Sequence, residues 1–177
     1  MEREKTRQFS IDQPTTDDVE GLHEMHIQSW FDTYPNEAQG ISREYIAECV
    51  KKFNVQRRVE IIEDSVKNPN HYMRVVHDEN GTVIGFSDSE IEDGTYELKG
   101  LYVDKPMQGT GLAKELMEDA LEWLGTDHEI FLIVVAYNIR AQKFYKKYGF
   151  EIVTGSDTFY DNEPLPVIKM VRKEDKA

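Results

Sequence analysis

The chain has 177 residues, of which 39% are hydrophobic and 31% are charged, and its formal net charge is −13. This length and composition are typical of a globular protein, so we expect residues 1–177 to form a single domain. The acidic charge disfavours binding to nucleic acid, and no apolar run approaches the ~20 residues needed to cross a bilayer, which disfavours a membrane protein.

The only cysteine is Cys49, so an intramolecular disulfide is excluded and a cysteine-based metal site is disfavoured. We expect no bound metal. The first ten residues contain charges but no apolar run behind them, so they do not read as a secretory signal. We therefore expect a cytoplasmic location.

The first third of the chain is predicted to be mainly helical. Apolar and aromatic residues recur at helical spacing from Val19 to Trp30, after a Pro14-Thr15 start that offers a capping oxygen. In chain order, the predicted elements are a strand at residues 9–12, a helix ending near residues 34–35, and helices at residues 41–53 and 55–66.

Strand-like segments follow, separated by the turn signals Asn80-Gly81 and Asp93-Gly94. They predict three consecutive antiparallel strands at residues 71–77, 82–90 and 95–104. The remaining predicted elements are a helix at about residues 112–124, a strand at 130–136, a helix at 138–148, and strands at 150–153 and 167–171. This order predicts a mixed α/β arrangement around one sheet.

A glycine-rich turn joins the strand ending near Val103 to the next helix. Gln108-Gly109-Thr110-Gly111 lets the backbone bend sharply and expose N–H groups where the helix begins. Such a helix start binds phosphate or pyrophosphate, because its free donors lie at the positive end of the helix dipole. The spacing matches neither a Walker loop nor a Rossmann fingerprint. Taken alone, the turn is equally consistent with a plain strand–helix loop.

Two motifs resemble those of the GNAT superfamily of N-acetyltransferases. Residues 108–113 resemble its acetyl-CoA signature, Gln/Arg-x-x-Gly-x-Gly/Ala, and residues 135–150 resemble its second motif, which contains Asn, Phe-Tyr and Gly-Phe. Residues 27–34 are similar to the first helix of many GNAT enzymes that act on small substrates. The resemblance covers about residues 8–172 and implies a GNAT-like α/β (mixed α+β) fold, with a central, mostly antiparallel, splayed sheet of six to seven strands and flanking helices.

The resemblance also implies that acetyl-CoA enters the gap between two diverging strands. The pantetheine amides would pair with one strand, the pyrophosphate would lie on the glycine turn, and the start of the following helix would reach the pantetheine or adenosine end. The implied cofactor residues are Leu101, Tyr102, Val103, Gln108, Gly109, Thr110, Gly111, Leu112, Ala113, Asn138, Arg140 and Lys143.

Acetyl transfer to an amine needs a base for the ammonium and an acid for the departing thiolate. The resemblance implies Tyr145 as the acid, since it is the tyrosine of the second motif; an aromatic core residue is the alternative. Glu97 matches the position of a catalytic glutamate in several GNAT enzymes, and a solvated strand residue is its alternative. Lys99 lies two residues later on the same strand face, and pairing with it would lower the pKa of Glu97 and weaken the base.

In GNAT enzymes the first helix and the loop after it form a wall of the acceptor site. Trp30 and Tyr34 are therefore expected to bind substrate, with core packing as the alternative. His23 and His26 are spaced i, i+3, but no further ligand joins them, so packing or pocket lining is favoured over metal binding. Residues 156–164 resemble a segment near the acceptor site of GNAT enzymes that acetylate polyamines.

Together these features predict an enzyme that moves an acetyl group from acetyl-CoA to a primary amine by direct attack in a ternary complex. The acidic charge favours a small or polyamine-like acceptor, and a protein N-terminus is also consistent. The alternative is a GNAT-fold protein that binds CoA as a sensor or scaffold with little turnover. The oligomeric state stays open, with a homodimer as one option.

Overall fold

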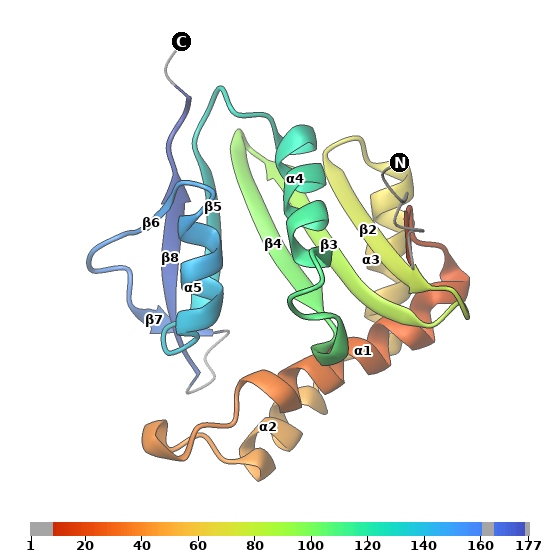
Figure 1. Cartoon of the computed structure of the whole chain (residues 1–177), viewed down its shortest axis with the longest axis horizontal. Helices are drawn as coiled ribbons and strands as arrows, with labels where there is room; N and C mark the ends of the chain where they lie inside the picture. Colours follow the sequence, from red (N-terminus) through yellow and green to blue (C-terminus); the bar gives the residue numbers. More distant parts are fainter. Residues whose placement is uncertain (1–8, 161–164, 176–177) are drawn as a thin grey trace, which may run out of the picture.

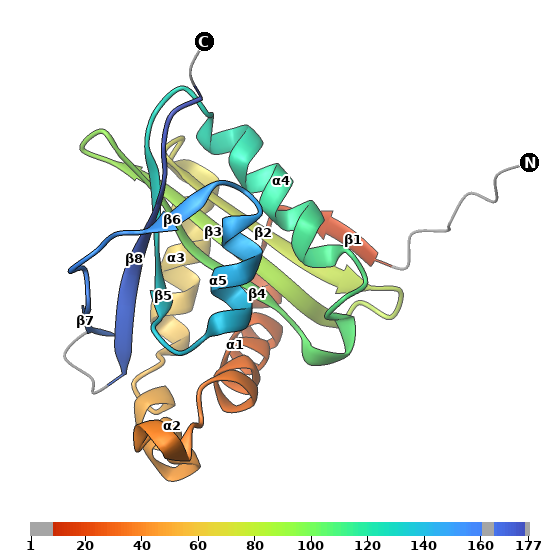
Figure 2. The ribbon, with the colours of Figure 1, turned by 60° about the vertical axis from the view of Figure 1, so that its left-hand side comes forward.

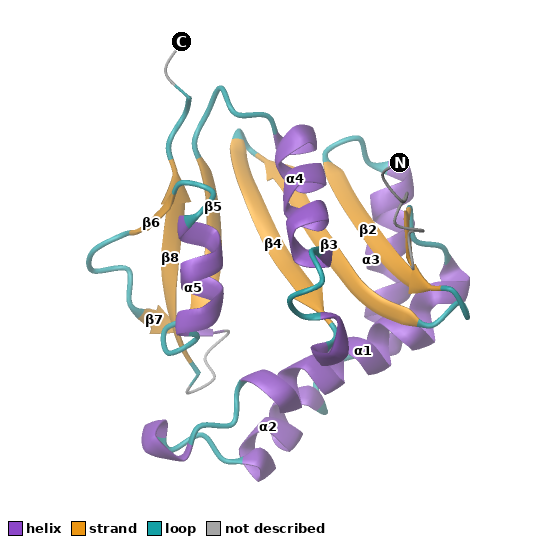
Figure 3. Ribbon diagram, viewed as in Figure 1, coloured by secondary structure: helices purple, strands orange, loops and turns teal. Residues whose placement is uncertain are grey.

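A computed structural model describes residues 9–160 and 165–175, and this part of the chain contains five α-helices and eight strands (Figures 1 and 3). In chain order they are β1 (Phe9–Asp12), α1 (Val19–Thr33), α2 (Arg43–Val50), α3 (Val55–Lys67), β2 (His71–Asp78), β3 (Val83–Glu92), β4 (Thr95–Val103), α4 (Leu112–Leu124), β5 (Ile130–Val135), α5 (Ile139–Lys146), β6 (Phe150–Ile152), β7 (Thr158–Phe159) and β8 (Pro166–Arg172). The predicted order of helices and strands is confirmed. None of the helices in these residues is long and apolar enough to span a membrane.

The strands form one sheet in the order β1-β2-β3-β4-β5-β8-β6, with β7 also paired to β8. Among the described residues, β4 and β5 are the only parallel neighbours; every other pair is antiparallel. This confirms the mixed α+β class and the mostly antiparallel sheet. The sheet has eight strands rather than six to seven, because the two-residue β7 also pairs with β8.

The sheet is splayed between β4 and β5. These strands pair only at Tyr96 with Ile130 and at Glu97 with Phe131. Beyond that point β4 continues beside β3 and β5 continues beside β8. Figure 1 shows the two strands close together at one end and apart at the other. The rest of β4 and β5 therefore presents strand edges that face each other without pairing.

Helices cover both faces of the sheet. On one face, α4 packs on β3 and β4, and Met117 and Leu124 join the β5 residue Leu132 and Phe150 in a buried cluster. On the other face, α1 and α3 cover β2 and β3, and α2 packs against α1 (Figure 2). On β5, Ile130, Leu132 and Val134 are buried on one face, whereas Ile133 on the other face is 39% exposed, so the apolar run is covered only in part.

Local sequence signals explain where the helices begin. The Asn54 side chain caps α3 by accepting the N–H groups of Gln56 and Arg57, and Ser42 caps α2 by accepting the N–H of Tyr45. The helix predicted at residues 41–53 is shorter than expected, since α2 ends at Val50. Short 3-10 turns that the sequence pattern does not reveal precede α1 and precede the glycine turn.

Candidate active site

A cavity of about 220 Å³ opens where β4 and β5 part. Its wall combines the open edge of β4, two residues of β5, the glycine turn, the start of α5 and the end of α1. The lining residues are Ser29, Thr33, Tyr34, Leu98, Lys99, Gly100, Leu101, Tyr102, Val103, Gln108, Gly109, Ala113, Ile133, Val134, Asn138, Arg140, Ala141, Phe144 and Tyr145. Segments far apart in the sequence thus meet around one space.

The glycine turn gives this cavity a set of backbone donors. Gly109 and Gly111 adopt φ values of 85° and 100°, which side chains other than glycine rarely tolerate. The first N–H of α4 with a helical acceptor is that of Glu115, which donates to Gly111 O at 3.1 Å. The residue at the N-cap position is Gly111, which has no side chain to cap the helix start. The N–H groups of Leu112 and Ala113 are therefore free for an anion, and the turn fits a diphosphate.

The open edge of β4 supplies the second element of a cofactor site. Leu101, Tyr102 and Val103 all line the cavity, and none of them pairs with β5. Backbone groups on an unpaired strand edge need partners, and an extended, amide-bearing arm satisfies them as a further strand would. These three residues fit the pantetheine part of CoA.

Arg140 and Gln108 connect the two sides of the cavity mouth. Arg140, at the start of α5, donates a short hydrogen bond to the side-chain oxygen of Gln108 in the turn. Asn138 accepts the N–H of Ala141 at 3.1 Å and so caps α5. Five of the expected cofactor residues on the turn and α5 line the cavity: Gln108, Gly109, Ala113, Asn138 and Arg140.

Four expected cofactor residues lie outside the cavity lining. Leu112 buries its side chain completely between the sheet and α4, so only its backbone can meet a ligand. The Thr110 hydroxyl donates to Met107 O at 2.7 Å within the turn. Gly111 lies at the helix start behind the lining, and Lys143 is exposed on α5. Contact of these residues with a cofactor stays a prediction.

Tyr145 projects from α5 into the cavity. Its ring packs edge-on against Phe144 and Phe150, with ring centroids 5.5 and 6.1 Å away. Burial, and to a lesser extent Tyr102 nearby, raises the pKa of the Tyr145 phenol well above its usual value. The phenol therefore keeps its proton throughout the physiological range and can act as a hydrogen-bond or proton donor.

Aromatic residues of α1 stand behind and beside the cavity. Tyr34 lines it, and burial together with a hydrogen bond to the Tyr102 hydroxyl raises the pKa of Tyr34. Trp30 is buried, does not line the cavity, and donates its indole N–H to His26 at 3.1 Å. Its ring meets Tyr34 edge-on, so Trp30 supports the wall that Tyr34 forms. The substrate contact expected of Trp30 stays a prediction.

His26 occupies the centre of this aromatic group. It stacks on Phe53, meets Tyr102 edge-on, and lies 2.7 Å from an Arg58 nitrogen through its Nδ1 atom. Burial, with the charge of Arg58, lowers the pKa of His26 to about 3. The imidazole is thus neutral and packed, in agreement with the packing role favoured over metal binding.

Glu97 lies next to the cavity, at the last position where β4 pairs with β5. Leu98, the following residue, is the first residue of β4 that lines the cavity. Burial raises the pKa of the Glu97 carboxyl; Lys99 and Lys169 act in the opposite direction, while Glu90 and Asp88 add to the increase. Its carboxyl is therefore a stronger base than an exposed glutamate.

The comparison with known protein families agrees with this arrangement. The family model described as acetyltransferase (GNAT) family matches residues 21–150. The chain belongs to the GNAT family of acetyltransferases. Its glycine turn and the α5 motif both lie within the matched region, and so do all the residues that line the cavity described above.

Solved structures share the GNAT fold over nearly the whole chain. The PaiA N-acetyltransferase from Thermoplasma acidophilum, in complex with coenzyme A, is 25% identical, with a TM-score of 0.77 over 93% of this chain and 98% of that one. The spermidine N-acetyltransferase from Vibrio cholerae, a dodecamer, is 20% identical, with a TM-score of 0.63 over 96% and 95%. YncA from Salmonella typhimurium, with acetyl-CoA, is 17% identical, with a TM-score of 0.69 over 96% and 95%. A search of curated proteins gave no significant match.

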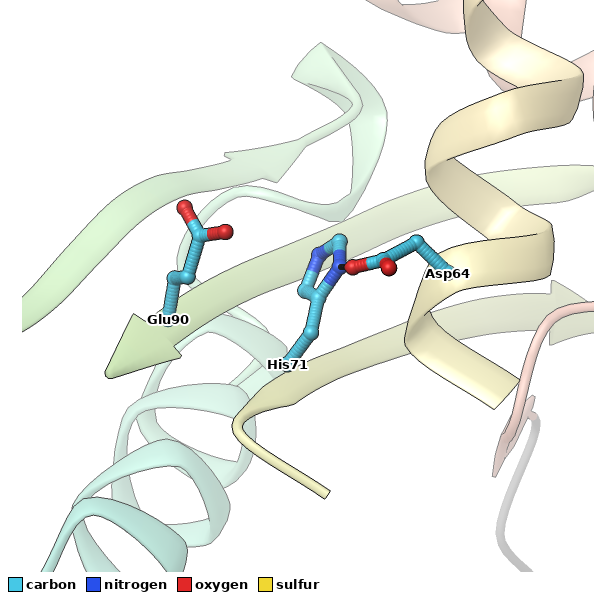
Figure 4. A group of neighbouring side chains, drawn as sticks. All are labelled: Asp64, His71 and Glu90. Carbon is cyan, nitrogen blue, oxygen red and sulfur yellow. Dashed lines mark hydrogen bonds and ion pairs between the residues drawn. The ribbon is translucent and has the colours of Figure 1, made fainter. Parts of the chain in front are cut away.

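A second polar group lies beside the GNAT cavity, on the face covered by α3. His71 is buried, and its two ring nitrogens lie 2.7 Å from an Asp64 oxygen and 2.8 Å from an Asp88 oxygen. Figure 4 shows Asp64 and Glu90 on either side of its ring, and one ligand atom from each of the three residues lies within 4.8 Å of the others. A metal ion bound to these three residues would have to break the contact between His71 and one carboxylate. It would also have to displace Lys99 from Glu90. The group is thus organised as a charge network.

Several residues of the cavity were not predicted from the sequence. Ser29, Thr33, Ile133 and Phe144 line it, and so does Lys99. The divergence of two strands exposes the β5 residue Ile133, and periodicity alone does not reveal such a divergence. The segment at residues 156–164 is described only in part, since residues 161–164 lie outside the described residues. Its Tyr160 ring meets Trp30 edge-on at 5.7 Å, which brings the segment next to the aromatic residues of α1.

Proposed function

We propose that this GNAT protein is an N-acetyltransferase that moves an acetyl group from acetyl-CoA to a primary amine by direct attack in a ternary complex. One observation carries the proposal: a single cavity is lined by the glycine turn and open β4 edge on one side and by Tyr145, Tyr34 and Ser29 on the other. A cofactor tail and an acceptor amine can therefore meet in the same space.

When bound, acetyl-CoA supplies the activated acetyl thioester. The acceptor reaches the site as an ammonium ion and must lose a proton before its nitrogen can form the new C–N bond. Glu97 accepts that proton, directly or through one water molecule, because it lies immediately beside the lining residue Leu98. Formation of the C–N bond leaves one further proton on nitrogen, which passes to solvent as the adduct collapses. Tyr145 donates a proton to the sulfur as the C–S bond breaks, and regains one from solvent.

The acidic residues near the cavity support a cationic acceptor. Asp88, Glu90 and Glu97 lie on neighbouring positions of β3 and β4, on the face that α1 and α3 cover. The net charge of −13 attracts amines over a longer range. A polyamine-like amine is the acceptor that best fits this charge, and the spermidine N-acetyltransferase of Vibrio cholerae shows that the fold accommodates such a substrate.

A thiol-release assay with a panel of amines tests the proposal. The purified protein is incubated with acetyl-CoA and a polyamine, a set of amino acids or a peptide with a free N-terminus, and free CoA thiol is measured. We expect release with at least one small cationic amine. Calorimetric titration with CoA provides the parallel measurement. Tight CoA binding without thiol release from any amine would favour the sensor or scaffold alternative, and no heat on titration would refute both readings.

A further inference from the structure

Lys99 occupies a bulge in β4, close to the proposed base. Asp88 of β3 lies opposite Gly100, and the next residue, Ser89, lies opposite Leu98, so Lys99 has no partner on β3. A bulge bends its strand and redirects the extra side chain. The Lys99 ammonium lies 2.5 Å from a carboxylate oxygen of Glu90, on the neighbouring strand. The bulge thus turns Lys99 toward β3.

Glu97 lies directly opposite Glu90 across β3 and β4. Its side chain makes no ion pair or hydrogen bond with any described residue, although Lys99 is only two positions away. The ammonium that would otherwise neutralise Glu97 is bound to Glu90 instead. Of the two carboxylates that face each other, Glu90 binds the Lys99 ammonium, and Glu97 has no ion-pair partner among the described residues.

We propose that Glu90 is a positioning residue for acetyl transfer: by binding the Lys99 ammonium, it leaves the Glu97 carboxylate free to accept the proton of the acceptor amine. This inference rests on the proposed function, and it assigns to Glu90 a role that acts through Lys99 and Glu97 rather than on the substrate.

The surrounding charges explain why Glu90 holds Lys99. Asp88, the other carboxylate of β3 near Glu97, already accepts a hydrogen bond from His71 at 2.8 Å, and Asp64 of α3 binds the second nitrogen of that ring. Lys169 of β8 lies over the Phe131 ring at 4.3 Å. Asp88 is therefore already occupied, and of the two remaining carboxylates, Glu90 and Glu97, Lys99 contacts Glu90.

The protonation states are consistent with this arrangement. Burial alone lowers the pKa of Lys99, but its hydrogen bond to Glu90 and the nearby carboxylates raise it above the usual value. Lys99 therefore remains an ammonium, and a direct pairing with Glu97 would lower the pKa of that carboxyl further than Lys99 does from its present position. The Lys99–Glu90 pair is half-buried, with 43% and 24% of the two side chains exposed, so solvent screens it only in part.

The test is the pH dependence of kcat in thiol release, whose acid-side midpoint reports the base in the ternary complex. Glu90→Gln frees Lys99 to pair with Glu97, so we expect the midpoint to move down by about one to three pH units, with a lower plateau. Glu90→Asp keeps the charge but shortens the reach, and we expect a smaller shift in the same direction. The matched control is Glu92→Gln, which removes one carboxylate from an exposed position two residues along β3 and should leave the midpoint unchanged.

A double-mutant cycle with Lys99→Met separates positioning from simple charge effects. If Glu90 acts by holding Lys99, Glu90→Gln should shift the midpoint downward in the wild-type background and by much less in the Lys99→Met background. Equal shifts in both backgrounds, or no shift with Glu90→Asp, would mean that Glu90 acts only through its own charge and would overturn the inference. Thermal melting and CoA titration establish that each variant is folded.

Glu97→Gln distinguishes failure of the inference from failure of the proposed function. If Glu97→Gln loses activity while Glu90→Gln keeps the wild-type midpoint, only the role of Glu90 is refuted. If Glu97→Gln keeps the wild-type rate and pH profile, Glu97 is not the base and the role of Glu90 is refuted with it, while thiol release by the wild type still supports the transferase. Absence of thiol release from the wild type refutes the proposed function itself.

Discussion

Replacing Tyr145 by phenylalanine tests the proposed proton donor with little disturbance of the fold. The Tyr145 ring contacts Phe144 and Phe150 edge-on, and a phenylalanine ring keeps both contacts. Only the hydroxyl that faces the cavity is lost. A side chain acting as general acid contributes about 10²–10⁴ in rate, so kcat should fall by that factor, equivalent to about 2.7–5.4 kcal/mol of transition-state stabilisation.

Burial keeps the pKa of the Tyr145 phenol well above its usual value, so the donor is protonated at every physiological pH. The loss of kcat in Tyr145→Phe should therefore be nearly independent of pH across the neutral range. The binding of CoA, measured by calorimetry, should be unchanged, because the phenol acts on the departing sulfur. Steady-state thiol release at saturating acetyl-CoA measures the effect.

The matched control is Tyr148→Phe, which removes a hydroxyl three residues further along the chain. Tyr148 belongs to the same aromatic cluster but does not line the cavity. Its variant should retain wild-type kcat. If Tyr145→Phe kept kcat within about twofold of the wild type, or if the two variants lost activity equally, the phenol of Tyr145 would have no role as proton donor.

Two further predictions concern the cofactor turn and the buried histidine. Gly111→Glu places a negative side chain at the start of α4, on a backbone whose φ of 100° is unfavourable for glutamate, so CoA binding measured by calorimetry should be abolished. The control Gly81→Glu has a similar φ of 81° but lies in the distant β2–β3 turn, and it should keep CoA binding. Retained CoA affinity in Gly111→Glu would contradict an anion site at this helix start. Burial lowers the pKa of His71, but Asp88 and Asp64 raise it by more, so the pKa in the folded protein is above the usual value. Charged His71 therefore contributes its full stabilisation below the unfolded pKa of about 6.5, and this contribution is lost as the pH rises through the higher folded pKa. Urea unfolding of His71→Gln should therefore show a larger loss near pH 6 than near pH 9, and an equal loss at both would mean that His71 is not charged in the folded protein.

The fold could be predicted from local signals because those signals agree with the tertiary structure. Asn80-Gly81 and Asp93-Gly94 lie at the turns between β2, β3 and β4, where glycine accommodates positive φ angles. Ile130, Leu132 and Val134 of β5 are buried on one face of the sheet, and the apolar stripe of α4 packs on the sheet. Each of these elements is specified within a window of a few residues.

The part of the cavity formed by the glycine turn was also predictable, since a turn and a helix start are local structures. Gly109 lies in the turn where its backbone is needed, and Gln108 and Ala113 flank the same space. The part of the cavity formed by the end of α1 was harder to predict from the sequence. The spacing of Trp30 on α1 is equally consistent with a wall or a core position, and only the packing of α2 against α1 shows that Trp30 is buried in the core.

The charge network depends on strand register, which the sequence pattern does not contain. An even spacing of two residues places Lys99 beside Glu97 on an ideal strand. The bulge at Lys99 breaks that spacing, and the register of β3 brings Glu90 opposite Glu97. The carboxylate of Glu90, nine residues upstream of Lys99, therefore binds the ammonium that was expected to weaken the base.

The point at which β4 and β5 separate connects the cavity with the proposed base. Glu97 and Phe131 form the last paired position, and the next residue of β4 already faces the cavity. The backbone of Glu97 is fixed by ladder hydrogen bonds on both sides, so its carboxyl has a defined position, while the strand edge just beyond it is free to bind a ligand. In the proposed mechanism, one structural feature both opens the space for the cofactor and holds the base at its end. If the strands separated one residue earlier, Glu97 would lose its pairing with β5 and its carboxyl would no longer be held from both sides.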